Sequence, residues 1–293
     1  MPRDVPARDA HCAIAQSAAV IGDWWSILIV RETARGRLRF DELQHELGIS
    51  RKVLTERLGH LADAGVLERV PYQSAPVRYE YRLTDAGRAL LPVLVAMQDW
   101  ADRWVLGDGS LSGSAAPDSA EAARIAALPG TRLPELLLPA HTGGELDPVD
   151  REAGATVLFC YPGPGRPAPQ PPGWLDIPGA AGCTLENRLF REAYPEFRAD
   201  GLAVRGVSTQ RPDEQREFAD AEDIPFPLLS DLDVRLAAAL RLPTFHVGQG
   251  LRLKRAVLVL DRDRVVRRAH FPVTDIPEAV RQALADAREV AGG

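Results

Sequence analysis

Cysteine is scarce in this sequence, with three residues among 293. So few thiols argue against a disulfide framework, and we expect them to be free or redox-active. Long hydrophobic runs are absent too, because the longest apolar stretches, such as residues 89–97, fall well short of the ~20 residues needed to span a bilayer. The N-terminus shows neither a hydrophobic signal nor an arginine-rich leader. We therefore expect a soluble, cytoplasmic protein with no membrane partner.

The sequence gives little support to a metal site or a nucleotide site. The six histidines are scattered without metal-ligand spacing, and Cys160 has no Cys-x-x-Cys partner. The loop PGPGRPAPQPPG, at residues 162–173, lacks the Lys-Ser/Thr pair of a phosphate loop. Its proline density is typical of a stiff lid or a contact surface. We expect no metal and no cofactor.

The net charge of −6 argues against a nucleic-acid partner, but its distribution weakens the objection. Residues 1–106 carry 14 basic and 14 acidic side chains, so the imbalance lies in the remaining 21 basic and 27 acidic ones. A neutral module can bind DNA if its cations are grouped, since phosphate contacts depend on the local field. The alternative interpretation is that these cations form an ordinary solvated surface that does not bind DNA. The grouped cations are Arg51, Lys52, Arg57, Arg69, Arg78 and Arg82.

Residues 39–83 have the pattern of two short helices followed by a hairpin. Apolar residues recur at helical spacing up to Gly48, which tolerates the positive φ of a helix C-cap. Ser50 then offers an N-cap oxygen to a second helix, which Gly65 closes. Alternating stretches around a turn at residues 74–76 predict the hairpin. This is the pattern of a winged helix-turn-helix, whose second helix enters a DNA major groove while the hairpin lies along the backbone.

Further motifs in this part of the chain are WWSILIVRE from residue 24, GIS.K.LT.RL..L...G from residue 48 and APVRYEYRLTDAG from residue 75. Together they resemble the HxlR family of MarR-like regulators over about residues 10–105. The resemblance implies a homodimer on a pseudo-palindromic operator of double-stranded DNA. It also implies that flanking helices, at roughly 12–22 and 84–104, build the dimer interface. The residues expected to contact DNA are Arg39, Ser50, Arg51, Lys52, Thr55, Arg57, Arg69 and Arg78, with Arg51 and Lys52 in the groove.

Cys12 lies at the start of a helix expected over residues 11–21, where the helix dipole would stabilise a thiolate. A redox-active thiol and a structural cysteine buried near the dimer interface are the two alternatives for it. The next helix is expected to bury Trp24. Residues 84–104 predict one long helix with Met97 and Trp104 along its buried side.

Composition changes abruptly after residue 106. Residues 107–127 are small, polar and rich in helix breakers, which predicts a flexible linker with room for one short helix. In residues 128–293, buried strands such as 155–160 and 202–208 alternate with helices, which indicates an α/β layered sheet. We therefore expect a winged-helix domain at 1–106, a linker at 107–127 and a second domain at 128–293.

Cys183 follows an apolar strand and a glycine, at the mouth of a helix. Backbone N–H groups and the dipole at that position would lower the pKa of the thiol, and a nearby guanidinium would add to the effect. A buried, inert cysteine is the alternative.

The motifs FCYP, GCT.E...F....EF, IPFPLLSD and LKRAVLVLD surround this cysteine. They resemble the bacterioferritin-comigratory, PrxQ-like peroxiredoxins of the AhpC/TSA group over about residues 132–290. The resemblance implies a thioredoxin fold, with Cys183 as the peroxidatic cysteine. It also implies that Arg255 polarises the peroxide and stabilises the thiolate.

Three positions depart from that family pattern. The hydroxyl residue three positions before the cysteine is Ala180 here, the proline seven before it is Asp176, and the optional resolving cysteine five after it is Arg188. Thr184 is a candidate substitute for the missing hydroxyl. Without the resolving thiol we expect a one-Cys cycle, or resolution by Cys160, Cys12 or an external thiol reductant.

The sequence thus predicts an α+β winged helix-turn-helix followed by an α/β thioredoxin-like, peroxiredoxin fold. The leading functional hypothesis is a transcription regulator whose C-terminal domain senses or scavenges peroxide or another oxidant. A thiol peroxidase that uses the winged helix for dimerisation is one alternative. A regulator with a catalytically degenerate redoxin domain is the other.

Overall fold

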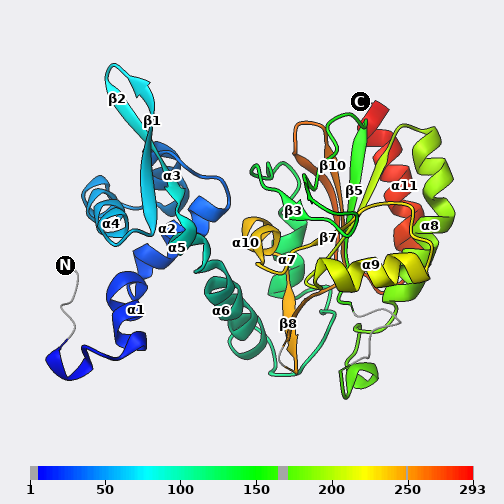
Figure 1. Ribbon diagram of the computed structural model, residues 1–293, viewed down its shortest axis with the longest axis horizontal. Helices are drawn as coiled ribbons and strands as arrows, with labels where there is room; N and C mark the ends of the chain where they lie inside the picture. The colour runs from blue at the N-terminus through cyan, green and yellow to red at the C-terminus, as the bar shows by residue number, and fades with distance from the viewer. Residues whose placement is uncertain (1–5, 164–170, 249, 293) are drawn as a thin grey trace. The chain divides into compact units, whose positions relative to one another are not determined.

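The computed structural model of the chain describes residues 6–163, 171–248 and 250–292 (Figure 1). The chain divides into two compact units, Met1–Leu94 and Val95–Gly293. This division lies before the boundary that we expected at residue 106. Part of the proline-rich loop, residues 164–170, falls outside the described residues.

The N-terminal unit is a winged helix-turn-helix, as predicted. Gly48 ends α3 with φ 61°, and the hydroxyl of Ser50 accepts the N–H of Val53 at 3.3 Å to begin α4. Buried leucines of α4 then form the core with α2 and α3. The elements in chain order are η1 (Ala7–Asp9), α1 (Ala13–Ile21), α2 (Trp24–Ala34), α3 (Phe40–Leu47), α4 (Arg51–Asp63), β1 (Leu67–Ser74), β2 (Val77–Leu83) and α5 (Asp85–Arg88).

The long helix predicted over residues 84–104 is interrupted. Thr84 caps α5 through its hydroxyl, which accepts the N–H of Gly87 at 3.1 Å. A separate helix, α6, then runs over Leu91–Trp104. Pro92 accounts for the break, because it has no N–H to donate to the carbonyl of Arg88 and its ring disfavours continuous helix there.

Three residues that we expected to be buried are exposed in the structure. The side chain of Trp24 is 71% exposed, whereas we expected it in the core. Met97 and Trp104 on α6 are also exposed, at 45% and 57%.

Among the described residues, no single helix has the length and apolar composition to cross a membrane. The pair α1 and α2, bent by 76°, meets those two criteria together.

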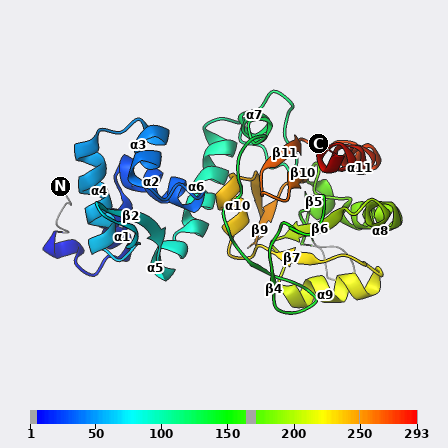
Figure 2. The same cartoon turned by 90° about the horizontal axis from the view of Figure 1, so that it is seen from above.

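The C-terminal unit is built on a five-stranded sheet with the order β11-β10-β5-β6-β7 (Figure 2). Strands β5, β6 and β7 are parallel, and β10 and β11 complete the sheet in antiparallel pairing. Two small hairpins, β3–β4 and β8–β9, lie outside it. The strands are β3 (Leu138–Pro139), β4 (Glu145–Leu146), β5 (Ala155–Cys160), β6 (Ala203–Ser208), β7 (Leu228–Ser230), β8 (Thr244–Val247), β9 (Gly250–Leu253), β10 (Ala256–Asp261) and β11 (Val266–His270).

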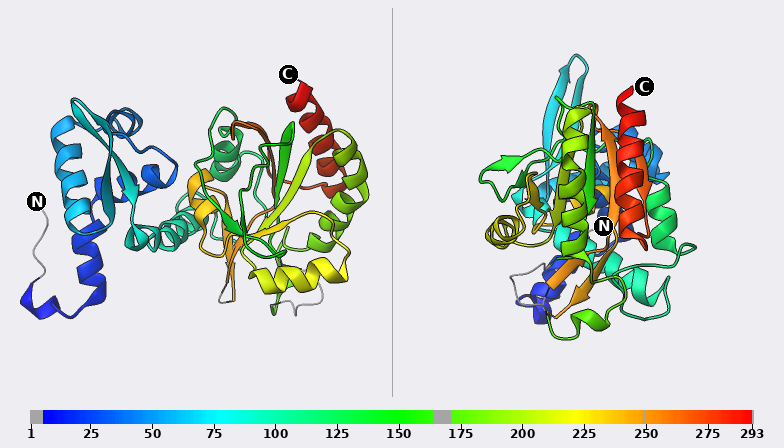
Figure 3. Two further views of the ribbon diagram at one scale, coloured as in Figure 1. Left: turned by 45° about the horizontal axis from the view of Figure 1, so that its top comes forward. Right: turned by 90° about the vertical axis from the view of Figure 1, so that its right-hand side faces the viewer.

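Helices α8 and α11 lie side by side over one face of this sheet (Figure 3). Aromatic side chains fill the space between them and the strands, with Phe159 stacked on Phe190 at 4.2 Å between ring centroids. This is the thioredoxin-like arrangement that the sequence predicted. The helices are α7 (Ala120–Ala126), η2 (Trp174–Asp176), α8 (Cys183–Ala199), α9 (Pro212–Ala221), α10 (Arg235–Leu240) and α11 (Ile276–Gly292).

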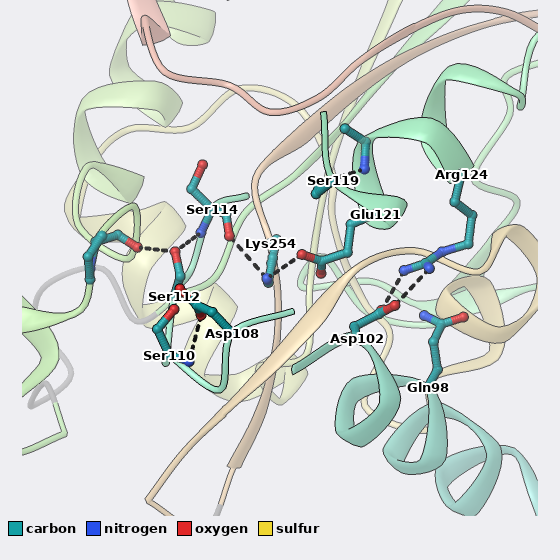
Figure 4. A network of polar contacts seen from close by, with 12 residues as sticks. Gln98, Asp102, Asp108, Ser110, Ser112, Ser114, Ser119, Glu121, Arg124 and Lys254 are labelled. Atoms are coloured by element: carbon teal, nitrogen blue, oxygen red, sulfur yellow. Dashed lines mark hydrogen bonds and ion pairs between the residues drawn. The ribbon is translucent and has the colours of Figure 1, made fainter. Parts of the chain in front are cut away.

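The segment predicted as a flexible linker is packed against the C-terminal unit. We call residues 107–119 the strap. The N–H of Gly113 donates to the carbonyl of Pro178 at 2.8 Å. Lys254 donates to the carbonyl of Ser114 at 3.0 Å (Figure 4). A Cβ on Gly113 would lie 2.9 Å from the backbone nitrogen of Ala180. The small residues that suggested flexibility therefore allow two backbones to approach closely.

Ion pairs fix the end of the strap and α7 (Figure 4). Lys254 and Glu121 form a buried pair at 2.8 Å. Arg124 binds both carboxylate oxygens of Asp102, at 2.9 and 2.6 Å. Bidentate pairs of this kind are geometrically specific. Residues 107–127 thus belong structurally to the second unit.

Candidate functional site

Cys183 is the first residue of α8, and the geometry of Gly182 places it there. Gly182 has φ 107°, in the region that favours glycine. A Cβ on Gly182 would lie 2.7 Å from the Cδ1 of Ile276 and 3.5 Å from the Nη2 of Arg255. Any other residue would be strained and would crowd the arginine. The glycine therefore lets the thiol and the guanidinium share one enclosed site.

Arg255 lies directly before β10 and meets Cys183 from the sheet side. Its Nη2 lies 3.8 Å from the Sγ of Cys183 and donates to the carbonyl of Ala181 at 3.0 Å. Its Nη1 pairs with the carboxylate of Glu186, one turn along α8. Cys183, Glu186 and Arg255 are 3%, 1% and 3% exposed. The predicted pairing of the thiol with Arg255 is present in the structure, with Glu186 as a third member.

We call Cys183, Glu186 and Arg255 the triad. Burial has the largest effect on the pKa values of its two acids, Cys183 and Glu186. It raises the pKa of the Cys183 thiol, while the Arg255 charge opposes the rise and the Glu186 charge adds to it. Our expectation of a lowered pKa at Cys183 is therefore wrong, because the helix mouth is closed to water. Burial also raises the pKa of the Glu186 carboxyl, to about 7, against the opposing charge of Arg255. The triad thus holds two acids of raised pKa on one guanidinium.

The turn before α8 supplies another contact of the thiol. Cys183 Sγ lies 3.7 Å from the carbonyl of Ala180, to which it donates. Ala180 is fully buried and offers no hydroxyl. Thr184 is half-buried, and no hydrogen bond within the described residues joins its hydroxyl to the thiol.

The other two cysteines lie in contrasting places. Cys160 ends β5, is fully buried and pairs in register with Ala256, and burial raises the pKa of its thiol far above the ordinary range. That environment is typical of an inert cysteine. Cys12 is exposed at the N-cap position of α1 in the single chain, and both alternatives for it stay open.

The residues expected to contact DNA lie mostly on the exposed side of α4 and the hairpin. Arg51, Lys52, Thr55, Arg69 and Arg78 are exposed. Arg51 lies over the ring of Phe40, at 5.0 Å from its centroid, and 3.7 Å from Asp41. Thr55 donates back to the carbonyl of Arg51 at 2.8 Å.

Two other expected contacts are engaged within the unit. Arg57 has a side chain that is only 17% exposed and pairs with Asp23 at 3.3 Å, so its guanidinium faces the start of α2. Arg39 lies over the ring of Tyr72 and pairs with Glu80 at 3.3 Å. In the single chain Arg57 is thus paired within the unit, while Arg39 retains an exposed side chain.

Comparison with known proteins identifies the first unit. The HxlR-like helix-turn-helix family model matches residues 20–108. An HTH-type transcriptional regulator of Bacillus subtilis is 40% identical over 87 residues, which are 29% of this chain and 81% of that regulator. The chain belongs to the HxlR-like helix-turn-helix family.

An HTH-type transcriptional regulator of Mycobacterium tuberculosis is 41% identical to this HxlR-like chain over 93 residues, 32% of the chain. The match spans 59% of the length of that regulator.

The C-terminal part of this HxlR-like chain carries an AhpC/TSA domain, whose family model matches residues 177–269. A putative peroxiredoxin of M. tuberculosis is 30% identical over 111 residues, 38% of the chain and 62% of that protein. The crystal structure of peroxidoxin BcpB from M. tuberculosis matches 55% of the chain and 96% of its own length, with 27% identity and a TM-score of 0.46.

Glu186 and Lys254 are residues of the AhpC/TSA domain whose roles the sequence did not reveal. Glu186 follows Cys183 by three positions, so both lie on one face of α8. That spacing is a usable signal, although it does not say that the carboxylate would bind Arg255. Lys254 precedes Arg255, and nothing in the sequence connects it with Ser114 or Glu121.

Proposed function

We propose that this protein is a DNA-binding transcription regulator whose C-terminal domain senses peroxide through Cys183. The observation that carries the proposal is the contact of Cys183 with Arg255 at 3.8 Å, in a chain that begins with an HxlR-like domain. A DNA-binding domain and a reactive thiol in the same chain suit a regulator that responds to oxidants. We place its action in the cytoplasm, where DNA and thiol reductants are both available.

The chemistry at Cys183 needs few groups. The thiolate attacks the terminal oxygen of a hydroperoxide, an S–O bond forms, the O–O bond breaks, and the leaving alkoxide takes up a proton to become an alcohol. The sulfur is oxidised to a sulfenic acid and the peroxide is reduced. Arg255 stabilises the thiolate before attack and the oxygen that leaves. Arg188 stands where a resolving cysteine would be, so an external thiol reduces the sulfenic acid in a one-Cys cycle.

We propose that DNA is bound by a homodimer of the first unit. Helix α1 is rich in apolar residues, yet none of them is buried, and Ile14 is 82% exposed. Trp24 is exposed as well. Apolar surface of this kind suits an interface with a second copy. In such a dimer, Arg51 and Lys52 of each α4 enter the major groove and Arg78 contacts a phosphate.

A regulator with a degenerate redoxin domain is the second candidate. The observations that favour it are the raised pKa of Cys183 and the methyl group of Ala180 where the peroxiredoxin pattern has a hydroxyl. Such a domain would bind ligands without turning over peroxide.

The deciding measurement is a gel shift with DNA from upstream of the protein's own gene, in which reduced protein is compared with protein treated with peroxide. In parallel, the sulfenic acid is trapped with a reagent and its position is found by peptide mapping. We expect the label on Cys183 and a change in DNA affinity that Cys183→Ser abolishes. Labelling that persists in Cys183→Ser, or that maps chiefly to Cys12, would overturn the assignment. DNA binding without any labelling would favour the degenerate domain.

A further inference from the structure

The strap lines a cavity that is separate from the thiol site. The cavity has a volume of about 700 Å³, within the range of cavities that bind small molecules. Its walls are the C-terminal half of α6, the strap, the start of α7 and strand β8, together with Lys254 and Pro178. Figure 4 shows polar side chains from several of these segments. None of the described residues that line the cavity belongs to the triad, so the peroxide chemistry does not account for it.

The lining of this cavity carries an excess of negative charge. Asp99, Asp102 and Glu121 each pair with a basic side chain. Asp108 and Asp118 are exposed, and no ion pair holds either of them within the described residues. Such a cavity attracts cations. Its acids are Asp99, Asp102, Asp108, Asp118 and Glu121, and its permanently charged bases are Arg103 and Lys254.

Two buried oxygens of the lining also lack a hydrogen-bond donor. They are Oε1 of Glu121 and Oγ1 of Thr244, which have no partner in the described parts of the chain, and the two residues are 7% and 1% exposed. Lys254 donates only to the other carboxylate oxygen of Glu121, at 2.8 Å. Burial raises the pKa of the Glu121 carboxyl despite this pair. Buried oxygens without donors are unfavourable, and a ligand in the cavity that brings N–H groups would relieve that cost.

We propose that this cavity binds an aliphatic diamine or polyamine. One ammonium group donates to Glu121 and Thr244, the two residues with unpartnered oxygens. A second ammonium group lies among the exposed carboxylates of Asp108 and Asp118. Each ammonium has three donors and carries the charge that the lining lacks. The exposed side chain of Leu106, which also lines the cavity, offers apolar surface to the methylene groups between them.

A ligand bound in this way would tie the strap to the rest of the C-terminal unit. Asp108 and Asp118 belong to the strap, whereas Thr244 begins β8 and Glu121 lies in α7. The bound amine would therefore add ionic contacts to the hydrogen bond that already joins Gly113 to the turn before α8. The cavity is thus a site for an effector that acts on the strap, which is a role beyond the proposed sensing of peroxide.

Binding is tested by calorimetry on the reduced, full-length protein at low salt. The probe is putrescine, and 1,4-butanediol is the uncharged reference of the same chain length. We expect putrescine to bind and the diol not to bind. Thr244→Val should weaken putrescine about tenfold or more, because hydrogen bonds to charged groups are the stronger kind. The free energy of unfolding should not fall in this variant, since the lost hydroxyl has no partner in the described residues.

The exposed carboxylates give a second, independent arm. Asp118→Asn should weaken putrescine about two- to fivefold, as for an exposed ion pair, and added salt should reduce the difference. The matched control is Asp233→Asn, which removes an exposed carboxylate outside the cavity and should leave the affinity unchanged. Hydrogen exchange then locates the ligand, because bound putrescine should slow exchange of the backbone amides in the strap.

Three results would overturn the polyamine site. They are equal binding of the diol, wild-type affinity in both Thr244→Val and Asp118→Asn, and protection from exchange that lies outside the strap and the other walls of the cavity. These measurements use reduced protein and no peroxide. A failure of the proposed peroxide chemistry would therefore leave the polyamine site standing, and loss of the polyamine site would leave the peroxide chemistry untouched.

Discussion

At the scale of single residues, the site is governed by the sharing of one guanidinium. Arg255 faces two acids, Cys183 and Glu186, and all three are almost completely buried. In such a closed space each charge acts strongly on the others. The state of Glu186 therefore sets how much of the Arg255 charge is left for the thiolate.

We predict opposite effects from two substitutions in this triad. Glu186→Gln removes the charge that raises the pKa of Cys183, so the thiolate should form at lower pH than in the wild type. Arg255→Met removes the charge that lowers this pKa, so the thiolate should form at higher pH. The pH dependence of Cys183 alkylation, in a Cys12→Ser background, measures both shifts.

The control for this pair is Glu278→Gln, an exposed carboxylate of α11 that should leave the curve in place. Shifts of the same sign in Glu186→Gln and Arg255→Met would contradict the sharing of Arg255 and point to a general loosening of the site.

At the scale of elements, α4 and the hairpin carry the surface that we assign to DNA, and two arginines there have different surroundings. Arg57 is bound to Asp23, whose carboxylate accepts the N–H groups of Trp25 and Ser26 at 3.0 Å and so begins α2. Arg78 is exposed on β2, and no ion pair holds it within the described residues. One arginine thus supports the fold, and the other is available to phosphate.

We predict that Arg78→Ala weakens DNA binding and that Arg57→Ala does not. Loss of a phosphate contact should weaken all DNA sequences alike and reduce the slope of log affinity against log salt by about 1. Arg57→Ala should instead lower the free energy of unfolding, by up to about 1 kcal/mol for a partly exposed pair. Fluorescence anisotropy at several salt concentrations, beside denaturant unfolding, separates the two effects. Equal loss of DNA affinity in both variants would contradict this prediction and show that Arg57 also contributes to DNA binding.

Elements with one dominant signal were predictable from the sequence, and elements set by distant contacts were not. The strand predicted at residues 155–160 coincides with β5, because five of its six residues are apolar and so short an apolar run favours a buried strand. The break at Pro92 was predictable in principle, yet the apolar spacing of residues 84–104 outweighed it in our interpretation. The strap was not predictable, because its small residues suit a mobile linker and a close backbone contact equally well. Arg255 beside Cys183 came from the family resemblance, since 72 positions separate the two residues.

At the scale of the whole molecule, the strap offers a route by which oxidation of Cys183 could affect the affinity for DNA. A flexible linker would let the two functions act independently, whereas the strap is bonded to the turn that leads into Cys183. Lys254, which holds the strap at Ser114, is adjacent to Arg255 in the chain. Helix α6 precedes the strap in the chain. Oxidation of Cys183 that moves the Pro178–Ala180 turn would therefore alter the contacts of the strap.

We predict that Gly113→Val uncouples DNA affinity from the oxidation of Cys183. Its Cβ would lie 2.9 Å from the backbone nitrogen of Ala180, so the strap has to leave the turn in either redox state. In the wild type, a typical coupling of about 1–3 kcal/mol would change operator affinity roughly 5- to 150-fold on oxidation. In Gly113→Val this ratio should fall toward one, while sulfenic acid still forms at Cys183. Ser110→Val, on the exposed part of the strap, is the control and should keep the wild-type ratio. An undiminished ratio in Gly113→Val would place the coupling elsewhere, and equal peroxide sensitivity in wild type and Cys183→Ser would move the switch to Cys12.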